Sequence, residues 1–250
     1  MADTDTLVEL MRQELPVALA AYAVTGPTGL VVVDEVNGFC TVGAGNLAPP
    51  APDAQVSRMV ETTAGLARRF REQRRPVLAL LDTHEPGKPE PPYPPHCERG
   101  TGEENLVPEL AWLERDPDVT LIRKDCINGF VGAMEPATVR GVHGASRNRI
   151  VDWVSGHRLE SIVCVGICTD ICVMDLVLTM LSARNHGCMP TLRDIVVLEP
   201  GCATFDLPRT TAAELGLPPT AAHPKWATHH MGLYFMASRG AVLASELTGV

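Results

Sequence analysis

The sequence predicts an α/β fold in which one mainly parallel β-sheet of six strands lies between two layers of helices. Short apolar runs alternate with longer stretches of helical periodicity along the chain, which is the pattern of βαβ units. The apolar runs are almost continuous, as expected for parallel strands buried on both faces. The chain shows no internal repeat, low-complexity linker or break in composition, so we expect residues 1–250 to form one domain.

The first half of the chain supplies two predicted strands, one helix and one long excursion. LVVVDEV (residues 30–36) is the first strand, and the Gly/Pro loop 43–52 connects it to a helix over residues 53–75, whose apolar residues repeat on one face. PVLALLDTH (76–84) is the second strand and, like the first, is acidic at its end. A long proline-rich loop follows at about residues 83–108.

The second half of the chain continues the alternation. The predicted elements are, in order, a strand over 119–125, a helix over 148–157, a strand over 161–167, a helix from near Thr169 to Asn185, a strand around 195–198, helices near 207–215 and 224–239, and a strand over 241–245. Glycine closes two of these helices, at Gly156 in SGH and at Gly187 in the HG that follows Asn185.

The charge and composition exclude several classes of partner. The net charge is -9 and the isoelectric point is near 5.3, so we expect neither nucleic acid nor an anionic membrane surface as a partner. No signal peptide and no apolar run of the roughly 20 residues that a membrane span needs is visible. The eight cysteines form no small-domain disulfide framework. We therefore expect a cytoplasmic protein with free thiols.

Chemically active side chains stand where the predicted strands end. In open parallel sheets the ligand site lies outside the carboxyl ends of the strands. Asp34, Asp82 and Lys124 occupy three of these ends, and a turn that contains Cys168 and Cys172 follows a fourth strand. We expect these residues to lie close together at one edge of the sheet.

The turn after residue 167 offers two candidate thiol nucleophiles. If Thr169 or Asp170 caps the following helix, Cys172 lies in its first turn, where the helix dipole favours the thiolate. Free backbone N–H groups at that helix end could stabilise an oxyanion. Cys168 lies in the turn itself and is better suited to contribute its backbone N–H. Both residues could also be ordinary buried cysteines, and this segment alone leaves that alternative open.

A thiol nucleophile needs a base, and Asp34 is the candidate. It follows a wholly apolar strand, where a carboxylate without a purpose is unusual, although Asp is also common in turns after strands. Lys124, in IRKD, could set the charge of both the carboxylate and the thiolate. An ordinary exposed lysine is the alternative.

The segment LDTHEPGKPEPPYPPHC carries a possible metal site. Asp82 and His84 are two residues apart, so their side chains point the same way along an extended chain. His96 returns after the prolines, and Glu85 and Glu90 lie between the two histidines. Imidazole and carboxylate ligands suit one divalent ion, zinc, iron or manganese. A D-x-H pair is also common by chance, and His84 could be a capping residue.

The sequence also resembles a known family over nearly its whole length. LVVVDEVNGFC, LLDTH, PPYPPHCERGT, RKDCINGF and GICTDICV, in this order, with RNHG and GCATFDLP after them, are similar to the nicotinamidase branch of the isochorismatase-like cysteine hydrolases. The sequences of these motifs are most similar to those of plant-type nicotinamidases. The resemblance implies the isochorismatase-like three-layer αβα fold. It also implies hydrolysis of nicotinamide to nicotinate and ammonia, a step of NAD salvage, through a cysteine thioester.

The resemblance assigns roles to individual residues. Asp34, Lys124 and Cys172 match the catalytic triad. The N–H groups of Cys168 and Cys172 match the oxyanion hole, behind a cis peptide bond between Ile167 and Cys168. The metal ligands match Asp82, His84 and His96 with Glu90 as the fourth ligand, although Glu85 stays open, and zinc is the first choice of metal with Fe²⁺ or Mn²⁺ as alternatives. Phe39 and Tyr93 match residues that line the pocket for the pyridine ring. Family members are often homo-oligomers.

Other functions remain open on the sequence alone. An amidohydrolase of the same superfamily could act on another small amide or on a ureido substrate. A non-catalytic protein that binds metal or senses redox state is the alternative from another class. His223, His229 and His230 flank the predicted C-terminal helix, and the adjacent His229 and His230 do not share a helix face, so we do not interpret them as a ligand pair.

Overall fold

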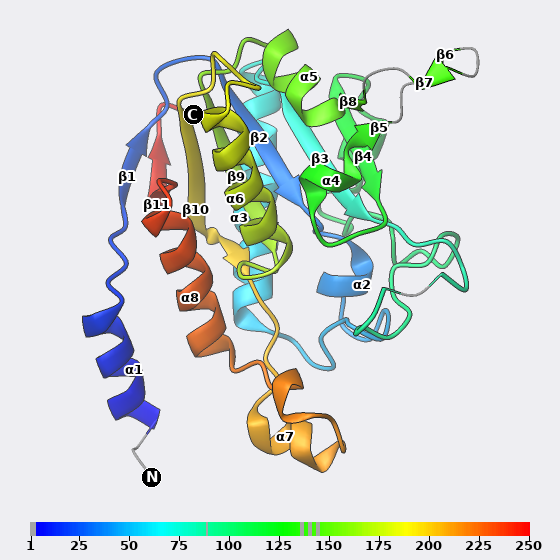
Figure 1. The fold of residues 1–250 in the computed structure, drawn as a ribbon, viewed down its shortest axis with the longest axis vertical. Coiled ribbons are helices and arrows are strands. Elements are labelled where there is room, and N and C mark those ends of the chain that lie inside the picture. Colours follow the sequence, from blue (N-terminus) through cyan, green and yellow to red (C-terminus); the bar gives the residue numbers. More distant parts are fainter. Residues whose placement is uncertain (1–3, 89, 136–137, 140–141, 144–145) are drawn as a thin grey trace.

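The computed structural model describes residues 4–88, 90–135, 138–139, 142–143 and 146–250, so Pro89 of the predicted proline-rich loop lies outside the described residues. A seven-stranded sheet with flanking helices confirms the predicted α/β class (Figure 1). Every strand pair in this sheet is parallel. From edge to edge it contains β1 (Ala20–Ala23), β11 (Val242–Thr248), β10 (Asp194–Ala203), β9 (Ser161–Ile167), β2 (Thr28–Val33), β3 (Val77–Asp82) and β4 (Val119–Lys124).

The prediction of six strands was wrong by one, because β1 was missed. Among the residues that the structure describes, this four-residue strand, AAYA, pairs with β11 alone, and it is largely exposed. Its three alanines are exposed, and alanine is depleted in strands, so the segment has neither the β-branched residues nor the alternation of buried and exposed positions that would predict a strand. Two antiparallel pairs lie outside the main sheet: β5 (Met134–Glu135) with β8 (Arg147–Asn148), and β6 (Thr138–Val139) with β7 (Val142–His143).

The central strands explain the continuous apolar runs. Along β2, Val31 and Val33 belong to the hydrophobic cluster on one face of the sheet, and Leu30 and Val32 belong to the cluster on the other face. All six residues of β2 are buried. Since each buried Val or Leu side chain contributes about 1.5–3 kcal/mol to folding, these strands anchor both layers of the core.

Helices cover both faces of the sheet. The longest, α3 (Ala54–Glu72), packs on one face, and α5 (Arg149–Gly156), α6 (Cys172–Asn185) and α8 (Lys225–Ser238) lie on the other (Figure 1). The remaining helical segments are α1 (Thr4–Glu14), α2 (Asn37–Cys40), α4 (Gly129–Gly132) and α7 (Arg209–Glu214), with single 3-10 turns at Ala111–Arg115 and Pro219–Ala221.

Side-chain caps fix the starts of two of the predicted helices. The Asp53 carboxylate accepts hydrogen bonds from the N–H groups of Gln55 and Val56 at the start of α3. Asn148 accepts from the next two free N–H groups at the start of α5. Such caps satisfy N–H groups that have no partner within the helix, so these residues place the boundaries.

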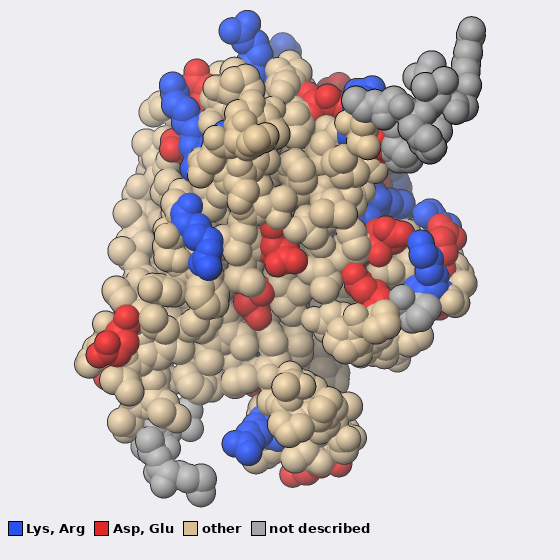
Figure 2. Space-filling view, in the orientation of Figure 1, with Lys and Arg blue, Asp and Glu red and all other residues tan. Residues whose placement is uncertain are grey.

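The loops at the carboxyl ends of the strands gather on one side of the molecule. There α2, the proline-rich loop and the segment that carries α7 follow strands that point toward them (Figure 1). Figure 2 shows Lys and Arg side chains scattered singly over the face in view rather than joined in one patch. Among the helices of the described ranges, none has both the length and the hydropathy that would let it cross a bilayer.

Candidate active site

Four adjacent strands bring the predicted site residues to one edge of the sheet. Asp34 directly follows β2, Asp82 ends β3, and Lys124 ends β4 in register with Asp82. Cys172 begins α6, five residues after the end of β9, which pairs with β2. Local strand-end positions are therefore sufficient to explain why these side chains meet.

Lys124 is the centre of a buried cluster of charges. Its Nζ atom lies 2.8 Å from Asp34 Oδ2 and 2.9 Å from Asp82 Oδ1, and it donates to the Cys126 carbonyl at 3.0 Å. The side chains of Lys124 and Asp34 are both 0% exposed. A buried cation can persist here because two carboxylates and a carbonyl surround it.

The two carboxylates that share Lys124 respond to it differently. Burial raises the pKa of Asp34 to about 6, and this rise is limited by the Lys124 cation and by hydrogen bonding from Lys124 and Cys172. Burial also opposes the charge of Asp82, but Lys124, His84 and His96 together hold its pKa well below the ordinary value. Asp82 is therefore a permanent anion near neutral pH, whereas Asp34 can take and return a proton.

The backbone around Asp34 is unusual. Asp34 has φ 54°, in the left-handed region that residues other than glycine seldom adopt. Its N–H donates to Leu80 O at 2.9 Å, and its carbonyl accepts from the Val36 N–H at 2.7 Å. Beside it, Gly166 has φ 129°, and a Cβ atom there would lie 2.0 Å from Val33 O. Only glycine therefore allows β9 to approach β2 this closely where the two strands end.

The turn between β9 and α6 differs in part from the sequence prediction. The Ile167–Cys168 peptide bond is cis, as the family resemblance implied. The helix does not begin near Thr169: its N-cap is Ile171, which offers no side-chain cap, and Cys172 is the first helical residue. The prediction that Thr169 or Asp170 caps the helix was wrong, because the N–H and Oγ1 of Thr169 both donate to Ala203 O in β10. The position of Cys172 in the first turn is confirmed.

The turn leaves two backbone donors available. Ile171 and Val173 donate to the Cys168 carbonyl, at 3.0 and 3.1 Å. Within the described part of the chain, none of the hydrogen bonds of the turn uses the N–H group of Cys168 or of Cys172. Two such N–H groups beside a thiol are the donor set of an oxyanion hole.

The environment of Cys172 holds the resting thiol in its protonated form. Its side chain is buried, and burial raises the pKa of the thiol well above the ordinary value, although the Lys124 cation opposes this rise. The expectation that the helix end favours the thiolate is therefore outweighed by burial and by the neighbouring Asp34 carboxylate. A base must remove the thiol proton, and Asp34 is the carboxylate beside it.

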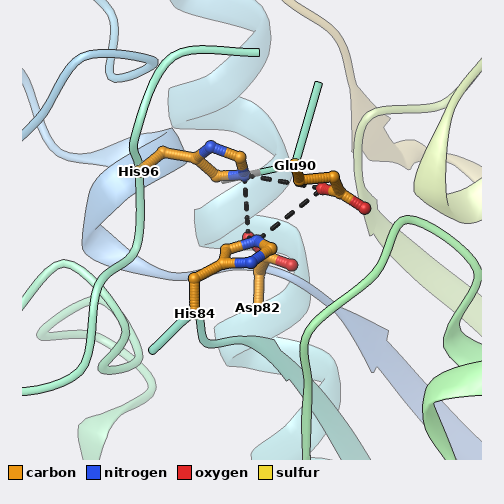
Figure 3. Close-up of side chains that lie close together, drawn as sticks. All are labelled: Asp82, His84, Glu90 and His96. Atoms are coloured by element: carbon orange, nitrogen blue, oxygen red, sulfur yellow. Dashed lines mark hydrogen bonds and ion pairs between the residues drawn. The ribbon is translucent and has the colours of Figure 1, made fainter. Parts of the chain in front are cut away.

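The proline-rich loop and the end of β3 together form a cluster of possible metal ligands (Figure 3). Asp82 Oδ2 lies 3.1 Å from His84 Nε2 and 3.2 Å from His96 Nε2. Glu90 Oε2 lies 3.7 and 3.8 Å from the same two nitrogen atoms. One atom from each of the four residues falls within 4.8 Å of all the others.

This donor set fits a small divalent ion. Ligand atoms bound about 2.0–2.1 Å from a tetrahedral zinc ion lie about 3.3 Å apart, close to the distances in the cluster. His96 Nδ1 lies 2.7 Å from the Pro94 carbonyl, which can only accept, so Nδ1 carries a proton. When the ring is neutral, the lone pair of Nε2 then faces Asp82 and Glu90. Such a carbonyl partner is typical of histidines that bind metals.

Of the two candidate glutamates, only Glu90 joins the cluster. Its second oxygen, Oε1, accepts a hydrogen bond from the Ile127 N–H at 2.8 Å, which orients the carboxylate. Glu85 is exposed and pairs with Arg99 at 2.8 Å instead. The fourth member of the cluster is therefore Glu90, the residue that the family resemblance preferred, and not Glu85.

Aromatic rings stand beside the metal-ligand cluster. The ring of Phe39, in α2, lies 5.6 Å from that of His96, and the ring of Tyr93 lies 6.1 Å from it, edge-on. Tyr93 is close enough to Cys168, Cys172, Glu90 and Asp170 for their charges to add to the effect of burial, which raises the pKa of its phenol. Tyr93 thus lies near both the cluster and the thiol turn, and Phe39 lies beside the cluster at His96.

Two features near the site were missed by sequence reasoning. Glu35, next to Asp34, is fully buried, and burial raises its pKa well above the ordinary value. The sequence assigned His223 no role in the site, but its side chain is only 13% exposed and forms an ion pair with Asp170. The signal for Glu35 was the second carboxylate after an apolar strand, whereas nothing local indicated that His223 meets residue 170.

Comparisons with known proteins agree with this arrangement. The isochorismatase domain model matches residues 28–219. Nicotinamidase 1 of Arabidopsis thaliana is 48% identical over 251 aligned residues, which cover 99% of each chain.

Solved structures share the fold at much lower identity. The nicotinamidase from Bacillus subtilis superimposes with a TM-score of 0.61 at 20% identity, covering 88% of this chain and 100% of its own. The pyrazinamidase of Pyrococcus horikoshii, solved in complex with zinc, gives 0.58 at 19% identity, covering 87% of this chain and 98% of its own. At these identities the structures support the fold alone.

Proposed function

The chain belongs to the isochorismatase-domain family, and from this membership we propose that its buried Asp34–Lys124–Cys172 cluster carries out amide hydrolysis. The enzyme hydrolyses nicotinamide to nicotinate and ammonia, a step of NAD salvage. The observation that carries the mechanism is the meeting of a protonated thiol, a carboxyl group with a pKa of about 6 and two unused N–H groups beside a four-residue metal cluster.

In the first half of the reaction Cys172 acts as the nucleophile. Asp34 takes the thiol proton while the sulfur attacks the carboxamide carbon, and the carbonyl oxygen becomes an oxyanion. The N–H groups of Cys168 and Cys172 donate to this oxyanion. When the carbon–nitrogen bond breaks, Asp34 gives its proton to the nitrogen. Ammonia leaves and a nicotinoyl thioester remains on the sulfur.

In the second half water releases the product. Asp34, ionised again, takes a proton from water as the oxygen attacks the thioester carbon. The carbon–sulfur bond breaks, and the proton returns from Asp34 to the sulfur. The nicotinic acid formed loses its carboxyl proton to water and leaves as nicotinate, and the enzyme regains its resting thiol.

Lys124 keeps Asp34 usable as a base. Burial alone would raise the pKa of Asp34 further, and the Lys124 cation limits this rise. Because Lys124 also holds Asp82, it connects the proton-transfer site with the metal cluster. The same cation attracts the developing thiolate, since it lowers the pKa of Cys172.

Asp82, His84, Glu90 and His96 would hold one divalent ion. We propose Zn²⁺, with Fe²⁺ or Mn²⁺ as alternatives, because two imidazoles and two carboxylates suit these ions. When bound, the ion would supply a Lewis acid for the pyridine nitrogen of the substrate, directly or through water. Phe39 and Tyr93 would cover the faces of the ring.

A panel of amides with matched variants tests this proposal. We expect the wild-type enzyme to release ammonia from nicotinamide and far more slowly from benzamide, which lacks the ring nitrogen. Cys172→Ala should abolish release, whereas Cys188→Ala, which changes an exposed thiol, should leave it unchanged. Undiminished release by Cys172→Ala would refute the nucleophile. Faster hydrolysis of ureido substrates than of nicotinamide would favour another amidohydrolase.

We also propose a cytoplasmic enzyme that forms homo-oligomers. The cellular location is supported by the eight cysteines, all of which are free thiols. Assembly is supported by the exposed apolar side chains Leu7, Leu10 and Trp226. Light scattering after size-exclusion chromatography should give a mass above 26.9 kDa, the mass of one chain.

A further inference from the structure

An ion pair fastens the nucleophile turn to a distant part of the chain. Asp170 lies between Cys168 and Cys172, and its Oδ2 atom is 2.7 Å from Nε2 of His223. The two side chains are only 12% and 13% exposed, so water screens the pair weakly. His223 lies beyond residue 219, where the match to the isochorismatase domain ends.

The partners of His223 require a doubly protonated ring. Nδ1 lies 3.0 Å from the Phe205 carbonyl, which can only accept a hydrogen bond. Nε2 faces the Asp170 carboxylate, which also only accepts when ionised. Although burial opposes both charges, the hydrogen bond between the two groups raises the pKa of His223 and lowers that of Asp170. An imidazolium therefore faces a carboxylate, which is a strong, directional contact.

His223 also closes the base of the segment that carries α7. Its ring stacks on Phe205, with centroids 3.9 Å apart and planes 10° apart. Its backbone exchanges two hydrogen bonds with Leu207, of 2.9 and 2.7 Å. Residues 205–223 thus form a lobe with a fixed base, which lies beyond the carboxyl ends of the strands (Figure 1). The His223 side chain joins this lobe to the thiol turn.

The other sides of the turn are held as well. In α8, a Cβ atom on Gly232 would lie 2.8 Å from the Cα atom of Asp170, so the helix packs directly on the backbone there. Thr169 Oγ1 contacts His229 Nδ1 at 2.8 Å. Thr169 is held by β10 and α8. The Asp170 side chain, through its contact with His223, anchors the last residues before Cys172.

We propose that Asp170 and His223 form a positioning pair that holds the turn so that the N–H groups of Cys168 and Cys172 point at the substrate oxyanion. The inference rests on the proposed function, since it assigns these N–H groups to the oxyanion hole. Neither residue of the pair takes part in proton transfer. Loss of the pair lets the turn move, which weakens binding of the transition state more than binding of the substrate.

Variants of His223 test the pair, because a positioning role predicts a large effect on kcat and a small effect on KM. Loss of one oxyanion donor lowers kcat by about 10²–10³-fold. His223→Leu displaces the donors without removing them, so we expect it to lower kcat by about 10- to 100-fold. The KM for nicotinamide should change less than about threefold. His223→Gln retains an N–H donor toward Asp170 and should recover about half of this loss on a logarithmic scale. His186→Leu, an exposed histidine at the opposite end of α6, should match the wild type.

An aldehyde analogue separates positioning from a purely structural role. With pyridine-3-carbaldehyde the Cys172 sulfur bonds to the aldehyde carbon, and the thiol proton moves to the carbonyl oxygen, which lies in the oxyanion hole. His223→Leu should weaken aldehyde binding by about the same factor as it lowers kcat/KM, while nicotinate binding stays within about threefold. Asp170→Asn should behave alike, and the double variant should be no worse than either single one.

Several results would overturn the proposal. These are a rise in KM with kcat unchanged, equal losses of aldehyde and nicotinate affinity, or additive effects of the two substitutions. If His223→Leu fails to fold, the comparison of His223→Gln with the wild type decides on the same criteria. Failure of the proposed function is seen separately, because the wild-type enzyme would then release no ammonia from nicotinamide. The aldehyde adduct on Cys172 can be measured without any turnover.

Discussion

Replacement of Asp34 by asparagine should lower kcat by about 10²–10⁴-fold and yet relieve a folding penalty. The side chain is 0% exposed and lies 2.8 Å from Lys124, which keeps Asp82 as a second carboxylate partner at 2.9 Å. Asparagine has the same shape and tolerates the left-handed φ of 54° at this position. The substitution therefore removes the proton-transfer group and the negative charge with little change in packing.

The size of each effect follows from the pKa of Asp34. Loss of a general base lowers kcat by about 10²–10⁴-fold. Folding raises the pKa of Asp34 from 3.8 to about 6, so the folded state holds its proton more tightly than the unfolded state. The unfolding free energy of the wild type therefore falls as pH rises between about 4 and 6, by up to about 3 kcal/mol from this one group. The unfolding free energy of Asp34→Asn does not show this decrease, because asparagine does not titrate.

The assay compares ammonia release at pH 7.5 with urea unfolding at pH 4.5 and pH 7. The unfolding free energy of Asp34→Asn minus that of the wild type should increase between the two pH values. Asp118→Asn, at an exposed carboxylate paired with Arg71, should show no such increase. The reasoning is refuted if Asp34→Asn keeps kcat within tenfold of the wild type, or if its difference in unfolding free energy is equal at both pH values.

Three further predictions follow from the same electrostatics. The kcat/KM for nicotinamide should rise with pH to a plateau with an apparent pKa near 6, because Asp34 acts as a base only when ionised. A rise with an apparent pKa near 4 would contradict this. Burial raises the pKa of Glu35 above its ordinary value. The unfolding free energy of Glu35→Gln minus that of the wild type should therefore grow by about 1.4 kcal/mol per pH unit above about pH 4.3. The same value of this difference at pH 5 and at pH 8 would exclude this. Glu90→Gln should weaken zinc affinity at least about tenfold in a competition titration, and Glu85→Gln should not; equal effects would reject the ligand set.

The strand-end residues could be predicted from the sequence because a parallel sheet makes them neighbours. Asp34, Asp82 and Lys124 each follow or end an apolar run, and the topology alone brings such positions to one edge. His84 could be added because it stands two residues after Asp82. The fourth donor could not be chosen from spacing, since Glu85 and Glu90 both lie in the loop and only the fold directs Glu90 inward.

The turn before Cys172 shows where local reasoning ends. Thr169 and Asp170 are residue types that often cap helices. Here the Thr169 hydroxyl donates to a carbonyl of β10 and the Asp170 carboxylate pairs with His223, so neither side chain caps α6. Both partners are distant in sequence, at residues 203 and 223. The charge state of Cys172 was also beyond the sequence, because burial, not the helix end, dominates the pKa of the thiol.

Detection of a nicotinoyl thioester tests the central claim most directly. Cleavage after Arg158 and Arg184 gives one peptide that contains Cys164, Cys168 and Cys172, so fragment ions must locate the modified residue. After an acid quench during turnover of nicotinamide, we expect the added mass of a nicotinoyl group on Cys172, and none in Asp34→Asn. A nicotinoyl group on Cys168, or turnover with no modified cysteine, would contradict the account.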